Sequence, residues 1–125
     1  MKSFGRLLSG DRCYANLLLL SLDSSRLGIF DFSSGKWLEA GRGGFFSFPG
    51  WSHDGRAVYY IQGGINPAVM RFRLESRGAE RVVDLRDLRL TGFYGSFLSL
   101  TPDDQPILTR DVGAQEVFAL EWKER

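Results

Sequence analysis

The sequence predicts an all-β protein built from short antiparallel strands, and three observations lead to this prediction. The apolar residues fall into runs of about five to seven residues, a typical strand length. Fifteen glycines and four prolines separate these runs, and no stretch carries the apolar spacing of a packed helix. Aromatic residues make up 14% of the chain and, together with Val and Ile, favour strands.

The expected strands follow one another along the chain. They cover residues 17–22, 27–32, 36–39, 45–48, 57–62, 68–74, 80–85, 95–100, 106–110 and 116–122. Turn-forming residues lie between them, as in Asp-Ser-Ser at 23–25, Ser-Ser-Gly at 33–35 and Gly-Gly at 63–64. Residues 1–16 are expected to form an irregular N-terminal segment. Because the connections are short, consecutive strands should pair as antiparallel meanders.

The chain also contains an internal repeat. Residues 51–60 (WSHDGRAVYY) align with residues 100–109 (LTPDDQPILT), 49 positions later, and residues 68–74 (AVMRFRL) align with residues 116–122 (EVFALEW), 48 positions later. Upstream, Phe30 and Phe32 precede Phe72 and Leu74 by 42 positions. Each unit would hold four strands, a to d, but the first lacks a clear strand a and the last lacks strand d. A four-stranded unit of about 40 to 45 residues indicates the blade of a β-propeller.

Residues 51–55 (WSHDG) resemble the WD-type repeat of TolB-like β-propellers, whose usual form is Pro-x-Trp-Ser-Pro-Asp-Gly. Pro49 and Trp51 hold the first and third positions of that pattern, whereas His53 replaces its second proline. In the last unit Pro102 restores this proline, and Asp104 stands where glycine is usual. Residues 111–122 are similar to the closing segment of propellers in large bacterial sensory regulators, behind a winged-helix DNA-binding domain. The resemblance implies a non-catalytic binding or sensory module and leaves the compartment, periplasmic or cytoplasmic, undecided.

The length of the chain fits only part of such a ring. A closed propeller of four or more blades needs roughly 160 residues at about 40 per blade, and this chain has 125. We therefore expect a partial β-propeller over residues 17–125, with blade pieces at 17–40, 45–85 and 95–122, as the C-terminal portion of a larger regulator. Its expected partners are the remainder of the propeller, a second copy through open blade faces, and a protein or small-molecule ligand. The alternative is the propeller portion of a peptidase or other hydrolase whose catalytic domain lies outside this chain.

The turn residues of the repeat are expected to have structural roles. Asp54 is predicted to accept backbone N–H bonds in an Asx turn, and Gly55 supplies a permissive backbone. Asp103 should have the same role in the last unit, and Trp51 is expected to pack between blades. A general-base role for His53 has no nucleophile beside it, so a solvated turn residue is expected.

Two further sets of side chains leave alternatives open. Arginines and acidic residues alternate over residues 71–89, which predicts ion pairs across neighbouring strands; the alternative is a rim for a carboxylate or phosphate ligand. The aromatic residues between positions 30 and 60 are expected to fill the space between sheets, the alternative being a platform for sugars or bases. They are Phe30, Phe32, Trp37, Phe45, Phe46, Phe48, Trp51, Tyr59 and Tyr60. Phe93 and Tyr94, between glycines on a long connection, are the candidate ligand loop.

Several classes of function lack the residues that they need. No Gly-x-Ser-x-Gly elbow is present, and one histidine with one cysteine cannot build a structural zinc site, so we expect no enzyme activity, cofactor or metal. The glycine clusters at 41–44 and 63–64 lack the lysine of a phosphate-binding loop. A net charge of +1 argues against a nucleic-acid partner. The longest apolar run, residues 17–22, is too short to insert into a membrane.

Overall fold

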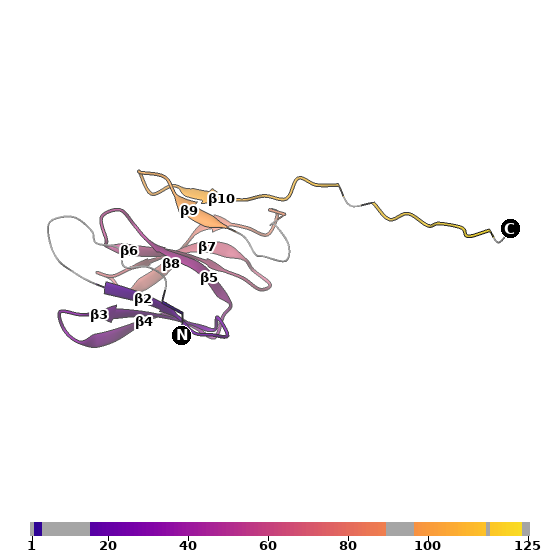
Figure 1. Cartoon of the computed structure of the whole chain (residues 1–125). Coiled ribbons are helices and arrows are strands. Elements are labelled where there is room, and N and C mark those ends of the chain that lie inside the picture. The colour runs from indigo at the N-terminus through magenta and orange to yellow at the C-terminus, as the bar shows by residue number, and fades with distance from the viewer. Residues whose placement is uncertain (1, 4–15, 90–96, 115, 124–125) are drawn as a thin grey trace.

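The computed structural model describes residues 2–3, 16–89, 97–114 and 116–123, and its strands form three antiparallel sheets (Figure 1). The first sheet has the order β1 (Lys2–Ser3), β2 (Asn16–Leu20), β3 (Arg26–Asp31) and β4 (Lys36–Arg42). The second has the order β5 (Phe46–Trp51), β6 (Ala57–Gln62), β7 (Ala68–Arg73) and β8 (Gly78–Asp84). The third is the hairpin of β9 (Leu98–Leu100) and β10 (Pro106–Leu108). The predicted all-β antiparallel fold is confirmed, and this part of the chain holds neither a helix nor a closed ring of sheets.

Both ends of the chain differ from the prediction. The first sheet gains strand β1, which pairs with the end of β2 and lies within the segment predicted to be irregular. The prediction of a strand over residues 116–122 is wrong, because this segment runs away from the sheets and pairs with none of the strands that the structure describes (Figure 1). The last unit therefore consists of two paired strands rather than three.

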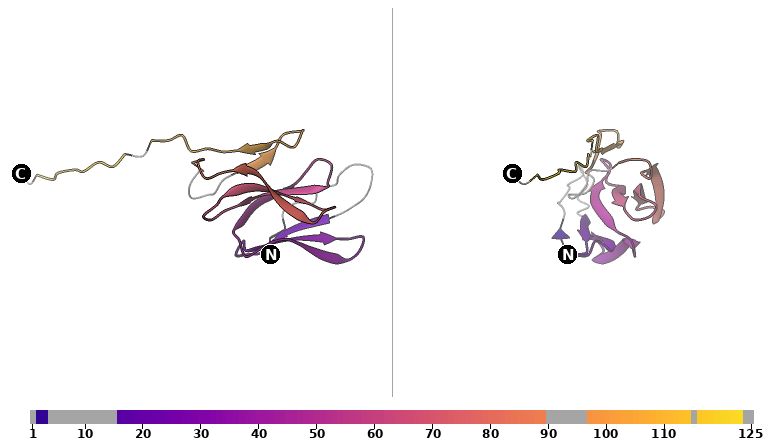
Figure 2. Two further views of the ribbon diagram at one scale, coloured as in Figure 1. Left: turned by 180° about the vertical axis from the view of Figure 1, so that it is seen from behind. Right: turned by 90° about the vertical axis from the view of Figure 1, so that its right-hand side faces the viewer.

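The three sheets lie in layers, with the second sheet in the middle (Figure 2). The first core lies between the first and second sheets. It consists of Leu18, Leu20, Leu27, Ile29 and Ala40 from the first sheet and Phe46, Trp51, Val58, Tyr60, Ala68, Met70 and Phe72 from the second. The second core, on the opposite face of the second sheet, consists of Ala57, Tyr59, Ile61, Val69 and Leu85, with Leu98, Leu100 and Leu108 of the third sheet packed against it.

Strand β6 shows why the second sheet is central. Five of its six residues are buried, and they alternate between the two cores. Val58 and Tyr60 face the first core, whereas Tyr59 and Ile61 face the second. A strand that is covered on both faces has a continuous apolar run instead of an apolar and polar alternation. The run AVYYIQ therefore places β6 inside the stack of sheets.

The first two sheets share a hairpin with the same register. Hairpins β3–β4 and β7–β8 have the same length and one β-bulge each, and every pair of the second lies 42 positions after its counterpart in the first. The matching outer pairs are Arg26–Arg42 and Ala68–Asp84, and the matching bulges lie between Leu27 and Gly28 and between Val69 and Met70. One inserted residue would change the face of every later side chain. The agreement therefore identifies a repeated structural unit, at the spacing expected from Phe30 and Phe72.

Candidate functional site

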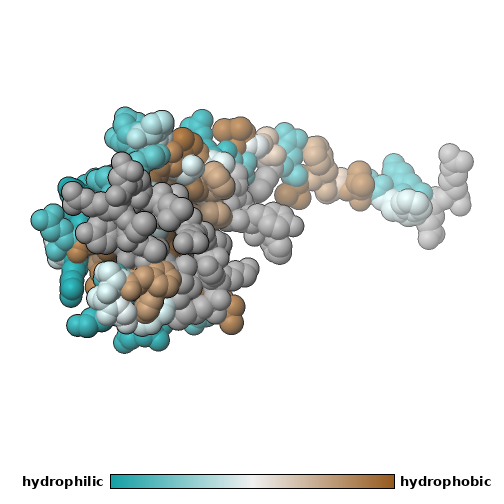
Figure 3. Space-filling model, turned by 60° about the vertical axis from the view of Figure 1, so that its left-hand side comes forward, coloured by the Kyte–Doolittle hydropathy of each residue, from teal (hydrophilic) through white to brown (hydrophobic). Residues whose placement is uncertain are grey.

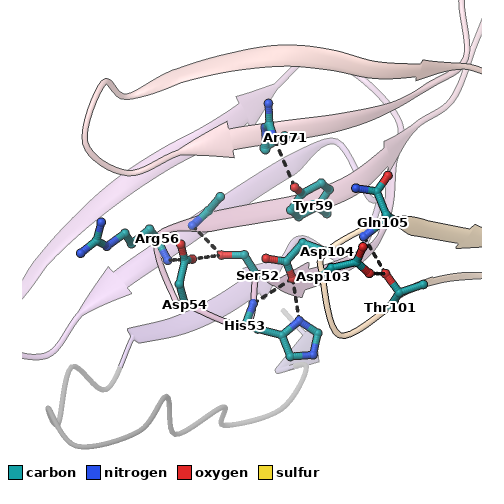
Figure 4. A network of polar contacts seen from close by, with 11 residues as sticks. Ser52, His53, Asp54, Arg56, Tyr59, Arg71, Thr101, Asp103, Asp104 and Gln105 are labelled. Carbon is teal, nitrogen blue, oxygen red and sulfur yellow. Dashed lines mark hydrogen bonds and ion pairs between the residues drawn. The ribbon is translucent and has the colours of Figure 1, made fainter.

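One hydrogen-bonding arrangement recurs at three turns of the chain, and the turn between β5 and β6 shows it in full (Figure 4). The Ser52 hydroxyl donates to Asp54 Oδ1 (2.6 Å) and accepts the N–H of Ala57 (3.0 Å). Asp54 Oδ1 also accepts the N–H of Arg56 (2.9 Å). Gly55 has a φ of 69°, which most side chains disfavour. The two side chains thus satisfy backbone donors that the reversal would otherwise leave without partners.

The turn between β2 and β3 has the same arrangement. Asp23 Oδ1 accepts the hydroxyl of Ser21 (2.6 Å) and the N–H of Ser25 (3.0 Å). The Ser21 oxygen in turn accepts the N–H of Arg26 (3.0 Å). The sequence pattern Ser-x-Asp therefore has one physical role here and at residues 52–54.

The turn between β9 and β10 uses a threonine in place of the serine. The Thr101 hydroxyl donates to Asp103 and accepts the N–H of Gln105 (2.9 Å) (Figure 4). Asp103 thus bonds within its own turn through the Thr101 hydroxyl, whereas the N–H of Gln105 is accepted by Thr101 and not by Asp103. The backbone bond that closes this turn joins Thr101 to Gln105, whereas the corresponding bond in the second sheet joins Ser52 to Ala57. The last turn is therefore one residue shorter.

The aspartates of these turns are held in the charged form. Hydrogen bonds from two serine hydroxyls lower the pKa of Asp23 from its ordinary value of 3.8 to about 2. The hydroxyl of Ser52 lowers the pKa of Asp54, and the hydroxyl of Thr101 lowers the pKa of Asp103. An effective general acid or base has a pKa close to the working pH. These carboxylates are therefore suited to holding turns rather than to transferring protons near neutrality.

His53 connects two of these turns by contacting an acidic residue 51 positions away in the sequence. Its backbone N–H donates to Asp104 Oδ1 (3.0 Å), and its ring Nδ1 lies 2.6 Å from the same oxygen (Figure 4). Asp104 has a φ of 61°, a left-handed conformation that aspartate tolerates better than most side chains. The prediction of a solvated turn residue is therefore incomplete, because the His53 side chain is 56% exposed and is nevertheless engaged by Asp104.

Both residues of this contact differ from the TolB-like pattern that residues 51–55 resemble. A proline at position 53 would have no N–H to donate, and a glycine at position 104 would have no carboxylate to accept it. The two replacements are complementary, because each supplies the partner that the other needs. Sequence reasoning treated them as separate departures and missed the contact. The available signal was that one pattern breaks at two neighbouring positions of its two copies.

Trp51 is buried in the first core, as the repeat predicted, with 8% of its surface exposed. Its indole Nε1 is buried and has no hydrogen-bond partner among the residues that the structure describes. The ring therefore acts through packing and not through a polar contact. The candidate ligand residues Phe93 and Tyr94 lie outside the described residues.

The glycine cluster at residues 41–44 packs against the ring of Phe46, a residue of the first core. A Cβ added to Gly41 would lie 2.8 Å from Cζ of Phe46, and one added to Gly44 would lie 2.9 Å from the same atom. Phe46 belongs to the first core, where its ring meets Tyr60 edge-on with 5.5 Å between the centroids. These glycines thus let the backbone approach an aromatic ring, which gives the cluster a packing role.

The arginines at the start of the charged stretch are held in ion pairs. Glu80 Oε1 accepts the Nε–H groups of Arg71 (2.6 Å) and Arg73 (2.8 Å). The Arg71 guanidinium also lies over the ring of Tyr59, 5.9 Å from its centroid, and donates to its hydroxyl (3.3 Å). These contacts support the predicted ion pairs across neighbouring strands. They also engage Arg71 and Arg73, two of the arginines that an anionic ligand could use.

Part of the aromatic set is exposed, which corrects the prediction that these rings fill the space between sheets. Phe32 and Trp37 are 56% and 55% exposed. Phe30 contacts both, with 5.0 Å between ring centroids in each case, and alternates along β3 with residues of the first core. These three residues form the outer-face cluster, on the side of the first sheet that faces away from the second. Phe45 and Phe48 are exposed as well, because they lie where β5 begins and where its register shifts.

Within the described ranges, no group of three or more His, Cys, Asp or Glu side chains is placed to hold a metal ion. The same residues include no helix of the length and apolarity that a membrane crossing requires. No protein-family model, curated protein or solved structure matches the chain. The resemblance to TolB-like propellers therefore rests on the residues of the repeat.

Sequence reasoning placed a turn at residues 23–25 but missed that this turn has the same Ser-x-Asp arrangement as the other two. The signal was present, because Ser21 and Asp23 have the spacing of Ser52 and Asp54. The turn lies between the second and third strands of its sheet, whereas the turn at Ser52 lies between the first and second. It therefore falls outside the period of the repeat, and turn chemistry alone could not assign its place in the sheet.

Proposed function

We propose that the chain is a non-catalytic binding or sensory module of the β-propeller type, with two blades and part of a third, within a larger regulator. The observation that carries this proposal is the hairpin repeated in β3–β4 and β7–β8, with its β-bulge at the same place. Four-stranded antiparallel meanders that repeat along a chain are the blades of propellers. The turn at Thr101 supports the same assignment for the third sheet. It connects β9 to β10 with the arrangement by which the turn at Ser52 connects β5 to β6.

The packing of the sheets supports the proposal, because equivalent positions meet their neighbours in a regular order. Met70 and Phe72 of the second sheet face the first sheet across the first core. Val69 lies on the opposite face, in the core covered by the third sheet. Leu27, which is equivalent to Val69, faces the second sheet in the same way. Equivalent strand positions thus face the same way in each sheet. The face that carries Met70 and Phe72 meets the preceding sheet, and the face that carries Val69, or Leu27 in the first sheet, meets the following sheet, as in blades around an axis.

The same order indicates what covers the outer-face cluster in the complete assembly. Phe30 and Phe32 hold the positions of Phe72 and Leu74, which pack on the preceding sheet. A further sheet of the same kind would therefore cover Phe30, Phe32 and Trp37. We assign this sheet to the remainder of the propeller, and we place the ligand, a protein or a small molecule, at the loops of one end.

The chemistry of the turns supports a role without catalysis. The Asp54 carboxylate is engaged by Ser52 and by the backbone of Arg56, and the His53 ring is engaged by Asp104. The Ser52 hydroxyl is itself bonded to Asp54 and to the Ala57 N–H, so all of these groups hold the backbone in place. The rigid sheets would then present recognition loops, which is a common division of labour in binding domains.

Two measurements test this function. The purified chain, incubated with p-nitrophenyl acetate, p-nitrophenyl phosphate and a fluorogenic peptide, is expected to give no turnover above buffer. Turnover that disappears in His53→Ala or Asp54→Ala would contradict the proposal. Sequencing of the flanking coding region separates the regulator from the hydrolase: a winged helix upstream supports the regulator, and an α/β-hydrolase elbow downstream contradicts it.

A further inference from the structure

We propose that residues 116–122 form a strand that adds to the free edge of β10 in a second copy of this chain, so that two chains exchange their C-terminal segments. The proposal rests on the same internal repeat as the proposed function. It concerns a different part of that repeat, namely the segment that follows β10, and its test has a separate readout.

The C-terminal segment exposes large apolar side chains. Val117, Phe118, Leu120 and Trp122 are 77% to 100% exposed. Figure 1 shows this segment leaving the sheets as an extended chain, and Figure 3 shows apolar residues along it. Isolated apolar residues are common on surfaces, but a row of them in an extended segment marks an interaction site.

The order of these side chains matches that of β7. Three side chains of the second sheet that pack into or against the first core have apolar counterparts 48 positions later. The pairs are Met70 with Phe118, Phe72 with Leu120, and Leu74 with Trp122. Alternate residues of a strand lie on one face. As a strand, the segment would therefore present an apolar face of the kind that β7 presents.

Strand β10 of the third sheet is equivalent to β6 of the second sheet, and β6 is the strand with which β7 pairs. The same separation of 48 positions relates Tyr59 to Ile107 and Tyr60 to Leu108. Tyr60 faces the preceding sheet across the first core, and Leu108 faces the preceding sheet across the second. Tyr59 lies on the opposite face of β6, and Ile107 is 48% exposed on the opposite face of β10. The third sheet thus has the partner that a third strand needs.

The outer edge of β10 is open among the described strands, because β10 pairs with β9 and with no other strand there. The Thr109 N–H donates to the carbonyl of Phe97, on the β9 side. In an antiparallel pair successive residues alternate in the direction of their backbone groups. The N–H and C=O of Leu108 therefore point away from β9 and form a template for another strand.

The repeat predicts the register of the added strand. In the second sheet Tyr60 pairs with Met70 and Gln62 pairs with Ala68. At 48 positions later, Leu108 would lie opposite Phe118, and Arg110 would lie opposite Glu116. Opposite charges on directly paired residues stabilise a sheet, and two apolar side chains on one face pack together. Both features favour this register.

The connection between β10 and residues 116–122 favours pairing of this segment with β10 of a second copy over pairing with β10 of its own chain. Residues 63–67 connect β6 to β7, and residues 111–115 are equal in number. The reversal in the second sheet uses Gly64 at a φ of 102°, and its counterpart is Val112. A β-branched residue disfavours positive φ. The Arg89 guanidinium also donates to the Gly113 carbonyl (3.1 Å) in the extended arrangement. Exchange between two chains leaves this connection extended.

A disulfide cross-link tests the register and the partner together. Leu108→Cys and Phe118→Cys are combined with Cys13→Ser, which removes the native thiol. Directly paired strand residues have Cα separations of about 4.5 to 5.5 Å, within the range of a disulfide. Under oxidising conditions we expect a covalent dimer on a non-reducing gel. The matched control combines Leu108→Cys with Ala119→Cys, which would place the second thiol on the other face and is expected to give no cross-link.

Further variants test the proposal without altering β9 or β10. Phe118→Asp with Leu120→Asp is expected to weaken dimerisation at least tenfold in sedimentation equilibrium, whereas Ala114→Asp, outside the added strand, is expected to leave it unchanged. Glu116→Lys is expected to weaken the dimer, and Arg110→Glu combined with Glu116→Lys is expected to restore it. Val112→Gly is expected to convert the covalent dimer of the cysteine variant into an internally cross-linked monomer.

Three results would overturn the proposal: a parent chain that stays monomeric, a cysteine pair that links only within one chain while Val112 is present, and a cysteine pair that forms no disulfide. None of these results would affect the proposed function. That proposal rests on the hairpins of the first two sheets, and the hydrolysis assay that tests it does not depend on dimerisation.

Discussion

The backbone N–H and the ring Nδ1 of His53 both lie within hydrogen-bond distance of a single carboxylate oxygen of Asp104, at 3.0 and 2.6 Å. This contact joins the turn of the second sheet to the turn of the third. The third sheet consists of two three-residue strands and covers the second core only in part. The contact therefore adds a polar attachment to a small apolar one.

Replacing either residue of this contact by the usual residue of the repeat should destabilise the chain. His53→Pro removes the N–H donor, and Asp104→Gly removes the acceptor, so each is expected to lower the free energy of unfolding by about 1 kcal/mol. The double variant should cost no more than the larger single change, because both remove the same contact. Urea unfolding of the four chains measures this coupling. Effects that simply add would show that the two residues act independently.

The turn aspartate of the second sheet is expected to contribute to stability and not to activity. Asp54→Ala removes the acceptor of the Ser52 hydroxyl and of the Arg56 N–H, and the expected cost is about 1 kcal/mol. Thermal unfolding followed by circular dichroism checks the change. Asp54→Asn keeps one acceptor oxygen and should cost less. Equal melting temperatures for all three chains would contradict the role of this turn.

Stability is expected to fall in acid because of the turn carboxylates. Bonds from serine hydroxyls lower the pKa of Asp23 and of Asp31 to about 2 in the folded chain, from an ordinary value of 3.8. The unfolded chain then binds more protons between these values, so the contribution is present above pH 3.8 and is lost as the pH falls towards 2. Urea midpoints between about pH 5 and pH 2 should decrease less steeply in Asp23→Asn with Asp31→Asn than in the parent. The same slope in both chains would contradict this cause.

Gly41, which packs against the ring of Phe46, should not tolerate a side chain. A Cβ at Gly41 would lie 2.8 Å from the Phe46 ring, so Gly41→Ala forces a core ring to move and is expected to cost about 1 to 3 kcal/mol. The control is Gly50→Ala, because an added Cβ there meets nothing within 4 Å. We expect the control to stay within about 0.5 kcal/mol of the parent in urea unfolding. Similar costs for both changes would contradict the close approach at Gly41.

Two tryptophans should differ in their contribution to stability. Trp51 is buried in the first core, so Trp51→Ala is expected to cost about 3 to 5 kcal/mol. Trp37 is more than half exposed in the outer-face cluster, and Trp37→Ala is expected to cost about 1 kcal/mol or less. Trp51→Phe should cost less than Trp51→Ala, since the indole N–H has no partner in the described structure. A larger loss at Trp37 than at Trp51 would reverse the assignment of the two faces.

Much of the fold could be predicted because the strands carry their signals locally. The run at residues 57–62 is apolar on both faces, and β6 is buried on both faces. The spacing of 42 positions between Phe30 and Phe72 gave the correct relation between two hairpins, because equal turns and equal bulges preserve the count. The sequence pattern and the structure agree in these segments, where each strand pairs with a strand that is its neighbour in the sequence.

The remaining features depend on distant parts of the chain. Residues 116–122 have the composition of a strand, yet a strand also needs a neighbour, and none is present there in the structure. The pair of His53 and Asp104 depends on how two sheets are stacked, which local turn chemistry does not determine. The exposure of Trp37 likewise depends on which sheet has a further layer. A sequence pattern indicates what a residue can pack against and not whether the partner is present.

The most direct test of the repeated unit is the register of its two hairpins in solution. Nuclear Overhauser contacts across the strands should pair Gly28 with Glu39 and, 42 positions later, Met70 with Arg81. Ala40 and Val82 should be the unpaired residues of the two bulges. Matching contacts in both hairpins are the result that this account predicts. A bulge in one hairpin only, or bulges at positions that do not differ by 42, would contradict it.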